Sequence, residues 1–205
     1  MPPTPTPPAV PTVPVLRTER LVLTAVRPDG DDTDTVYAAC QDPEIQRWTV
    51  IPSPYTRADA VHFTDTLAAE GRRTGKDLVF AFRATEDGPL LGCVAVHRRE
   101  HPLTAEVGFW ATPAARGRGL TVEALTALAR WAFAELGLAR LEWRAYLGND
   151  ASRAVAERVG FRVEGVQRAA LVQRGELRDC LVGGLLAEDL GLPMPAPHAP
   201  APARP

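Results

Sequence analysis

Hydrophobic positions recur along the chain with two different periods. Between Gly119 and Leu136 they stand three and four residues apart, which places them on one face of a helix, and Gly137 follows as a C-terminal cap. Weaker helical spacing occurs in three other stretches, where Thr56, and Asn149 or Asp150, stand at the positions of N-terminal caps. The pattern predicts four helices, over residues 31–41, 56–73, 119–136 and 149–159.

Shorter runs that are rich in β-branched and aromatic residues predict strands. The last two runs flank Gln173-Arg174-Gly175 and form a hairpin, whereas residues 42–56, which hold several prolines and serines, are expected to form a loop. The order of elements predicts an α+β fold, in which helices pack on a central, mostly antiparallel seven-stranded sheet. The expected strands cover residues 20–26, 77–84, 90–98, 105–111, 140–146, 161–171 and 176–187.

The two ends of the chain differ in composition from the rest. Proline, alanine and threonine dominate residues 1–14 and 193–205, and such segments lack the large apolar side chains that offset the entropy lost on ordering. We expect both to be disordered tails. Residues 15–192 then form one domain, and a hydrophobic content of 45% in this chain of 205 residues is enough for a core.

Charge, hydropathy and cysteine content exclude several classes of protein. A net charge of −2, with arginines interleaved among acidic residues, is unlike the basic surface of a nucleic-acid-binding protein. No run reaches the roughly 18 apolar residues of a membrane span and no signal peptide is visible, so we expect a cytoplasmic protein. The three widely spaced cysteines Cys40, Cys93 and Cys180 indicate free thiols. His97 and His101 have no further ligands at metal-binding spacing, so we expect no metal.

One segment carries candidate chemistry. Arg116-Gly117-Arg118-Gly119 follows a predicted strand and opens the longest predicted helix. Glycine allows the backbone to approach a ligand closely, and the first N–H groups of a helix have no partner within it and favour an anion. The junction is therefore a candidate phosphate site, although an ordinary tight turn would have the same sequence. The P-loop and dinucleotide-binding motifs do not match it.

The motifs around this segment resemble those of the GNAT N-acetyltransferases, and most of all the RimJ/RimL type, which acetylates the N-terminus of ribosomal proteins. The resemblance covers about residues 16–187. It rests on the order of elements, on the glycine loop, on Asn149-x-x-Ser152 and on Gly160-Phe161-x-x-Glu164-Gly165. The chain departs from the family pattern at Thr121, where glycine or alanine is usual.

The resemblance implies both a fold and a co-substrate. A GNAT sheet splays apart between its fourth and fifth strands, and the acyl donor is acetyl-CoA, whose pantetheine arm pairs with the fourth strand. Its pyrophosphate lies on the amides of the glycine loop, and the asparagine binds the pantetheine or cysteamine portion. The cofactor-binding residues carried over to this chain are Phe109, Trp110, Ala111, Arg116, Gly117, Arg118, Gly119, Leu120, Thr121, Val122, Asn149 and Ser152.

The resemblance also implies direct attack of a neutral amine on the thioester. A base must take the proton of the ammonium form, and Glu106 on the fourth strand is the candidate, with a salt-bridged strand carboxylate as the alternative reading. Many GNAT enzymes protonate the leaving thiolate with a tyrosine seven residues after the asparagine, but Ala156 stands there. Ser152 fills this role in the RimL type, although a serine in a first helical turn also satisfies backbone groups.

The acceptor is less well defined. In this family the early loop lines the acceptor site, so Trp48 and Tyr55 are candidate substrate-binding residues, with plain hydrophobic anchors of the loop as the alternative. We expect transfer of an acetyl group to a primary amine, either of a protein N-terminus or of a small molecule. Transfer of another acyl group such as succinyl, and a non-catalytic acyl-CoA-binding module, are the alternatives. A homodimer is also left open.

Overall fold

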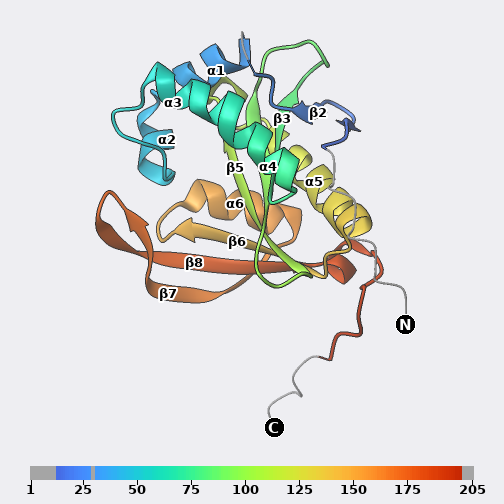
Figure 1. The fold of residues 1–205 in the computed structure, drawn as a ribbon. Helices are drawn as coiled ribbons and strands as arrows, with labels where there is room; N and C mark the ends of the chain where they lie inside the picture. The colour runs from blue at the N-terminus through green and yellow to red at the C-terminus, as the bar shows by residue number, and fades with distance from the viewer. Residues whose placement is uncertain (1–12, 29–30, 200–205) are drawn as a thin grey trace, which may run out of the picture.

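Eight strands form one sheet in the computed structural model, which describes residues 13–28 and 31–199 (Figure 1). Their order across the sheet is β1-β2-β3-β4-β5-β6-β8-β7. All neighbours are antiparallel except β5 and β6, which run parallel. The strands are β1 (Leu16–Arg17), β2 (Val22–Ala25), β3 (Asp77–Arg83), β4 (Gly92–Arg98), β5 (Thr104–Ala111), β6 (Arg140–Tyr146), β7 (Arg162–Gln173) and β8 (Glu176–Leu186).

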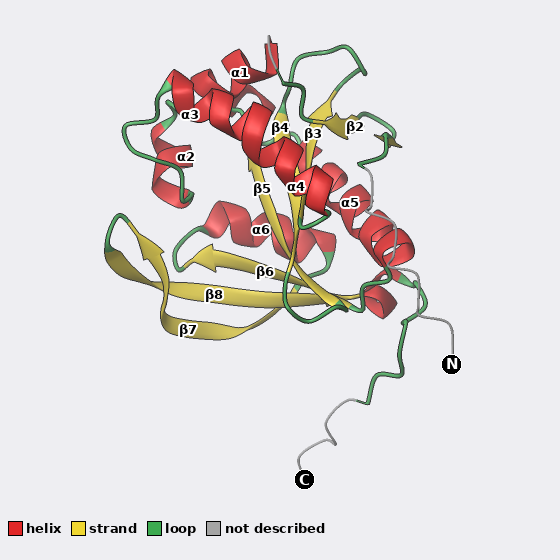
Figure 2. Cartoon of the chain, in the orientation of Figure 1, coloured by secondary structure: helices red, strands yellow, loops and turns green. Residues whose placement is uncertain are grey.

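The helices pack on both faces of this sheet and enclose two separate cores (Figure 2). Successive side chains of a strand point to opposite faces, so on β3 Phe80 and Phe82 enter the core under α5 and α6, while Ala81 enters the core under α1 to α4. The helical elements are α1 (Asp31–Ala39), α2 (Pro43–Trp48), α3 (Arg57–Val61), η1 (His62–Leu67), α4 (Ala68–Thr74), η2 (Pro113–Ala115), α5 (Leu120–Leu136), α6 (Asp150–Val159) and η3 (Ala187–Leu190).

Strands β5 and β6 separate part-way along their length. Their pairing runs from Thr104 opposite Arg140 to Val107 opposite Trp143 and then stops. Both strands continue past that point, β5 to Ala111 and β6 beyond Trp143. In Figure 1 the strands β6, β8 and β7 turn away from β5. The splay predicted between the fourth and fifth strands is thus confirmed, because these are β5 and β6 here.

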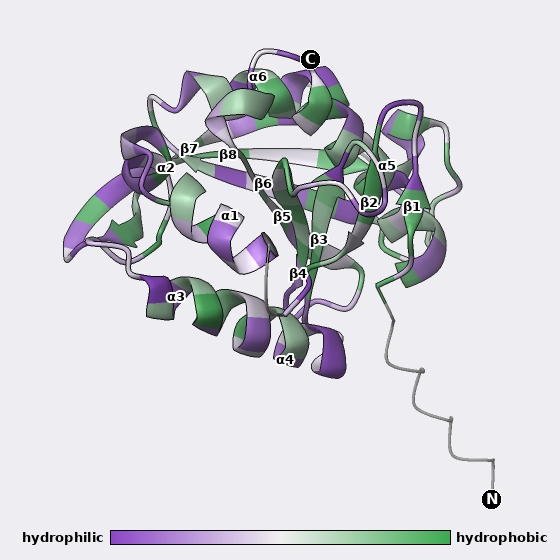
Figure 3. Cartoon of the chain, turned by 90° about the horizontal axis from the view of Figure 1, so that it is seen from above, coloured by the Kyte–Doolittle hydropathy of each residue, from purple (hydrophilic) through white to green (hydrophobic). Residues whose placement is uncertain are grey.

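The longest helix, α5, begins and ends at glycines, as the hydrophobic spacing predicts. Gly119 and Gly137 both adopt left-handed backbone angles, with φ of 75° and 64°, which a residue with a Cβ atom adopts only under strain. The buried face of α5 packs on β4 and β5. Figure 3 shows the hydrophobic residues gathered in the central strands, while α3 and α4 carry hydrophilic residues on their outer side.

The predicted fold class is confirmed, but two details of it are wrong. The sheet has one strand more than expected, because the two-residue β1 pairs with β2 at Leu16 and Arg17. The expected loop 42–56 contains the helix α2, because the Asp42 carboxylate accepts hydrogen bonds from the amides of Glu44 and Ile45 at 2.8 and 3.1 Å. A proline at the first helical position completes this start signal.

The expected helix 56–73 is present, but a π-helical segment interrupts it. Thr56 provides the predicted capping box with Asp59 at its start. Within η1 the buried Thr64 hydroxyl lies 2.9 Å from the hydroxyl of Thr33 on α1 and 3.2 Å from the carbonyl of Ala60. A hydroxyl that competes for helix carbonyls disturbs the regular backbone pattern, which the hydrophobic spacing does not reveal.

Most of the two expected tails, residues 1–12 and 200–205, lies outside the described residues, so their disorder and the division of the chain into domains stay predictions. Of residues 193–199, Met194 packs against the core under α5 and His198 Nδ1 lies 2.7 Å from Glu188. Within the described ranges, no helix combines the length and the apolar character that crossing a membrane requires.

Candidate active site

The glycine loop joins the open end of β5 to the start of α5. After the short turn η2, Gly117 and Gly119 both have positive φ values, 71° and 75°, and Gly119 forms the N-cap without a side chain to bond the first helical amides. Among residues 13–28 and 31–199, no acceptor pairs with the amides from Gly117 to Val122. These amides, including those of Leu120 and Thr121, form a ready site for a phosphate group.

The two arginines of the loop differ in what their side chains do. The Arg116 guanidinium forms two hydrogen bonds with the Asp42 carboxylate, at 3.1 and 3.2 Å, and its charge is therefore paired with the start of α2. The Arg118 side chain is exposed and forms no ion pair within the described part of the chain. Arg118 is thus the loop residue whose positive charge is available to an anion.

Glu123, one turn into α5, fastens the N-terminal segment to this helix. Its carboxylate accepts hydrogen bonds from the Thr18 hydroxyl at 2.5 Å, the Arg20 amide at 2.9 Å and the Arg20 Nε at 2.6 Å. Burial by itself would raise the pKa of Glu123, but these hydrogen bonds outweigh burial and lower it. The Arg20 guanidinium also donates to the Arg118 carbonyl at 3.1 Å, which fixes the backbone of the loop from outside.

The three predicted cofactor-binding residues of β5 lie beyond its last pair with β6. Phe109 and Ala111 pack toward α5, whereas Trp110 packs toward the core under α1 to α4. On the opposite edge these three residues pair with β4, so only the edge that faces β6 is unpaired. An unpaired strand edge presents N–H and C=O groups to any extended ligand that carries amides.

Asn149 and Ser152 lie at the start of α6, and Ser152 contacts Trp143, the last residue of β6 that pairs with β5. The Asn149 side chain caps α6 by accepting a hydrogen bond from the Ser152 amide at 3.1 Å. The Ser152 hydroxyl oxygen accepts a hydrogen bond from the Trp143 indole Nε1 at 2.9 Å. No acceptor in the described ranges takes the Ser152 hydroxyl proton, so this proton is free to be donated.

The predicted base, Glu106, is held by two arginines. Its carboxylate forms an ion pair with Arg99, and Arg144 Nη1 lies 4.0 Å away. The side chain is 20% exposed and sits on β5 where that strand still pairs with β6. This arrangement is the salt-bridged strand carboxylate that the sequence left as the alternative reading.

Trp48 and Tyr55 occupy different environments. Tyr55 is buried, 6% exposed, in the core with Cys40 and Cys93, and burial raises the pKa of its hydroxyl. Burial likewise raises the pKa of the Cys40 thiol to about 11. Tyr55 therefore stands where a hydrophobic anchor would. Trp48 is half-buried at the end of α2, with the Arg47 guanidinium 4.6 Å from its ring centroid, and its ring lies beside Gly148.

The tip of the β7–β8 hairpin reaches the end of α2, a contact that sequence analysis missed. Gln173 Nε2 donates to the carbonyls of Arg47 and Thr49 at 2.9 and 3.1 Å, and Arg174 donates to the Gln46 carbonyl at 3.0 Å. These two side chains satisfy carbonyls at the helix end that have no partner within the helix. The hairpin, α2 and the loop at Gly148 thus form one wall on the side of β6 that faces α2.

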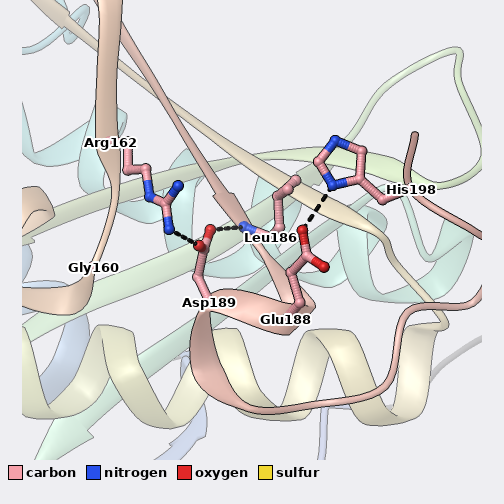
Figure 4. A pocket seen from close by; sticks show the side chains of 6 residues that line it. All are labelled: Gly160, Arg162, Leu186, Glu188, Asp189 and His198. Atoms are coloured by element: carbon pink, nitrogen blue, oxygen red, sulfur yellow. Dashed lines mark hydrogen bonds and ion pairs between the residues drawn. The ribbon is translucent and has the colours of Figure 1, made fainter. Parts of the chain in front are cut away.

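A separate hollow of about 530 Å³ lies at the end of the sheet where β6 begins and β8 ends (Figure 4). Its charged residues are already paired: Arg162 with Asp189 at 2.5 Å, and His198 with Glu188 at 2.7 Å. Asp189 also accepts a hydrogen bond from the Leu186 amide at 2.9 Å. Because these charged side chains already pair with one another, this hollow is not the candidate site. Within the described ranges, no three His, Cys, Asp or Glu residues gather as metal ligands.

Comparison with known proteins shows which protein family has these splayed strands and this glycine loop. Residues 20–162 match the model of the family described as "Acetyltransferase (GNAT) domain". The chain belongs to the GNAT acetyltransferase family. It is an N-acetyltransferase, and acetyl-CoA is its acyl donor.

Individual relatives agree with this assignment. The chain is 32% identical over 145 residues to "Putative ribosomal N-acetyltransferase YdaF" of Bacillus subtilis, covering 70% of this chain and 78% of that protein. Among solved structures it is similar to RimJ of Mycobacterium smegmatis in complex with CoA-disulfide, with 25% identity, 89% and 90% coverage and a TM-score of 0.69. A GNAT acetyltransferase from Bacillus anthracis shares the fold, with a TM-score of 0.73, 22% identity, and 85% and 99% coverage. The resemblance to the RimJ/RimL type is thus confirmed.

Proposed function

We propose that the opening between β5 and β6 is the place where this GNAT enzyme transfers the acetyl group. One observation carries the proposal: the strands separate after Val107 and Trp143, directly beside the free amides at the start of α5. The amides from Gly117 to Val122 would hold the pyrophosphate, with Arg118 close by. The unpaired edge of β5 from Phe109 to Ala111 would pair with the pantetheine amides.

Acetyl-CoA supplies a thioester carbonyl at the innermost point of this opening. An amide of β5 that is aimed at the carbonyl oxygen would stabilise the negative charge that develops there, a contribution of roughly 3 kcal/mol. Ser152 would donate its proton to the leaving thiolate, because its oxygen is fixed by Trp143 and its proton is free. Trp143 is then a positioning residue, which acts through the Ser152 hydroxyl.

The acceptor is a primary amine, and we infer that it enters from the side of α2. Support comes from the wall that α2, Gly148 and the hairpin tip form around β6, and from Trp48 at the end of α2, whose half-buried ring lies beside Gly148. A protein N-terminus and a small-molecule amine both fit this class. The name of the curated relative, a putative ribosomal N-acetyltransferase, favours a ribosomal protein as the acceptor. The homodimer, the cytoplasmic location and the lack of a nucleic-acid partner stay predictions.

Thiol release from acetyl-CoA, measured with a panel of N-terminal peptides and small amines, tests the proposal. The expected result is turnover with at least one amine, and N-terminal peptides are expected to have the higher kcat/KM. Faster turnover with succinyl-CoA would support the alternative acyl group. Binding of CoA without turnover on any amine would support the non-catalytic module and refute the proposal.

The variant Ser152→Ala tests the proposed acid. We expect kcat to fall by about 10²-fold, because the thiolate loses its proton donor, while CoA affinity measured by calorimetry stays the same. Trp143→Phe keeps the serine but removes the indole N–H, and should cause a smaller fall in kcat with the same CoA affinity. An unchanged kcat in Ser152→Ala would exclude the serine from the mechanism.

A further inference from the structure

His97 is held by a carboxylate on the neighbouring strand. It lies on β4 directly opposite Asp77 on β3, and its Nδ1 is 2.7 Å from Asp77 Oδ1. An ionised carboxylate only accepts hydrogen bonds, so in the neutral ring the proton must sit on Nδ1. The lone pair of the ring is then on Nε2. This pairing of a carboxylate and an imidazole fixes both the tautomer and the direction of the ring.

The free nitrogen of this ring points to the inner end of the strand opening. A Cβ atom built on Gly108 would lie 3.0 Å from His97 Nε2, so the ring stands directly over the backbone of Gly108. Gly108 is the first residue of β5 after Val107, the last one that pairs with β6. A larger side chain at position 108 would displace the ring. Because Gly108 has no side chain, Nε2 can lie beside the position that we propose for the thioester carbonyl.

Glu106 lies on the same face of the sheet as His97, but its side chain is already paired. Residues opposite each other in an antiparallel pair point to the same face, and His97 is opposite Glu106. The Glu106 carboxylate is bound by Arg99 and faces Arg144, whereas His97 Nε2 has no hydrogen-bond partner within the described part of the chain. The charged groups on this face include Asp77 from β3, Glu106 from β5 with its partner Arg99, and Arg144 from β6.

We propose that His97, and not Glu106, is the base that takes the proton from the acceptor amine, and that Asp77 positions it. This role rests on the proposed site of transfer between β5 and β6. The ammonium form of the acceptor gives one proton to Nε2, directly or through one water. The amine nitrogen then forms a bond to the carbonyl carbon, and the bond from carbon to sulfur breaks.

The protons balance across the two proposed groups. The amine nitrogen gives up its second proton to water as the amide forms, and the thiolate gains one from Ser152. Ser152 is reprotonated from water, and His97 releases its proton to solvent. The net change is one amide, one free thiol and one proton released per turnover, with no further reactant.

Steady-state kinetics of His97→Gln, with Glu106→Gln as the matched comparison, test the role. We expect kcat/KM of His97→Gln to fall by about 10²-fold and its decline toward low pH to disappear, while CoA affinity is unchanged. Glu106→Gln should keep the wild-type pH profile. Asp77→Asn should lower kcat by about tenfold and shift the pH profile, and Asp77→Glu should restore part of the activity.

The variant His97→Ala distinguishes a catalytic role of the imidazole from a purely structural one. In His97→Ala, added imidazole should restore part of the lost activity in proportion to its basic form, which a structural role would not allow. Wild-type kcat/KM and pH profile in His97→Gln would overturn the role, as would a loss of activity that is matched by a loss of CoA affinity. A wild-type protein that acetylates no amine overturns the proposed function together with this role, whereas an active wild type with a fully active His97→Gln overturns this role alone.

Discussion

The two sides of the β5–β6 opening are built by different means. On the side of α5 the backbone makes the site: two glycines with positive φ, a helix start without a capping side chain, and an unpaired strand edge. On the side of α2 side chains hold the elements in place. Arg83 binds Asp32 below α1, Arg116 binds Asp42 before α2, and Gln173 binds carbonyls at the end of α2.

This difference corresponds to what each side binds. The amides of the pantetheine arm and the pyrophosphate are the same in every acyl-CoA, so backbone groups suffice to bind them, and many side chains are tolerated there. The acceptor differs from enzyme to enzyme, and elements held by side-chain contacts change position when those few residues change. We therefore expect substitutions to affect CoA binding mainly where they alter backbone geometry, and to affect the acceptor side through single polar contacts.

The largest expected effect is on the α2 side, at a buried ion pair. Asp32 binds both terminal nitrogens of Arg83 at 2.8 and 2.5 Å, and both side chains are almost fully buried, at 1% and 0% exposed. Asp32→Ala leaves the arginine charge buried without its partner, so we expect the free energy of unfolding in urea to fall by about 3–5 kcal/mol. The double variant Asp32→Leu/Arg83→Met should recover most of this loss. A loss below about 1 kcal/mol in the single variant would show that α1 does not depend on the pair.

A smaller effect, and a specific one, is expected at the start of α5. Gly119→Val places a branched side chain at a positive φ beside the free amides, so CoA affinity measured by calorimetry should fall roughly ten- to a hundredfold, as when charge-assisted hydrogen bonds are lost. Gly137→Val is the matched control, because Gly137 has a similar φ of 64° at the other end of the same helix and open space around it. It should lose comparable stability but no CoA affinity. Equal CoA affinity in the two variants would contradict the backbone site.

Sequence patterns predict the side of α5 better than the side of α2, for a physical reason. The glycine loop, the α5 helix and the Asn149 cap are local features, fixed by residues within a few positions of each other. The contact of Gln173 with Arg47 joins residues 126 positions apart, and no periodicity records it. The start of α2 did have a local signal, since Asp42 is followed by proline, but the loop composition obscured it.

The candidate catalytic groups also depend on long-range contacts that no local sequence pattern reveals. The alternation along β5 places Glu106 on the face that turns to α2, yet the alternation says nothing about its neighbours. Its pairing with Arg99 and the direction of the His97 ring both depend on the register between β3, β4 and β5. Register follows from the whole sheet, because a shift of one residue exchanges the faces of a strand. Sequence reasoning therefore places Glu106 on its strand and face, while its ion pair with Arg99 and the position of His97 on the neighbouring strand β4 are decided in three dimensions.

The smallest expected effect is at the link between the two sides. Asp42 caps α2 and pairs with Arg116 of the glycine loop. Burial alone would raise its pKa, but the hydrogen bonds from Arg116 and from the amides of Ile45 and Glu44 outweigh burial and lower it. A carboxyl with a lowered pKa in the folded state stabilises the fold at neutral pH, and this contribution is lost as the pH falls through that pKa.

Two variants separate the cap from the ion pair. Asp42→Asn keeps a good N-cap but loses the charge, so the free energy of unfolding at pH 7 should fall by about 0.5–1 kcal/mol, and the difference from the wild type should vanish once acid protonates Asp42. Asp42→Ala should lose about 1 kcal/mol more at pH 7, because the cap is lost too. Urea unfolding at neutral and acid pH measures both. If the gap between the wild type and Asp42→Asn were independent of pH, the charge would contribute nothing, and the loop and α2 would be joined by packing alone.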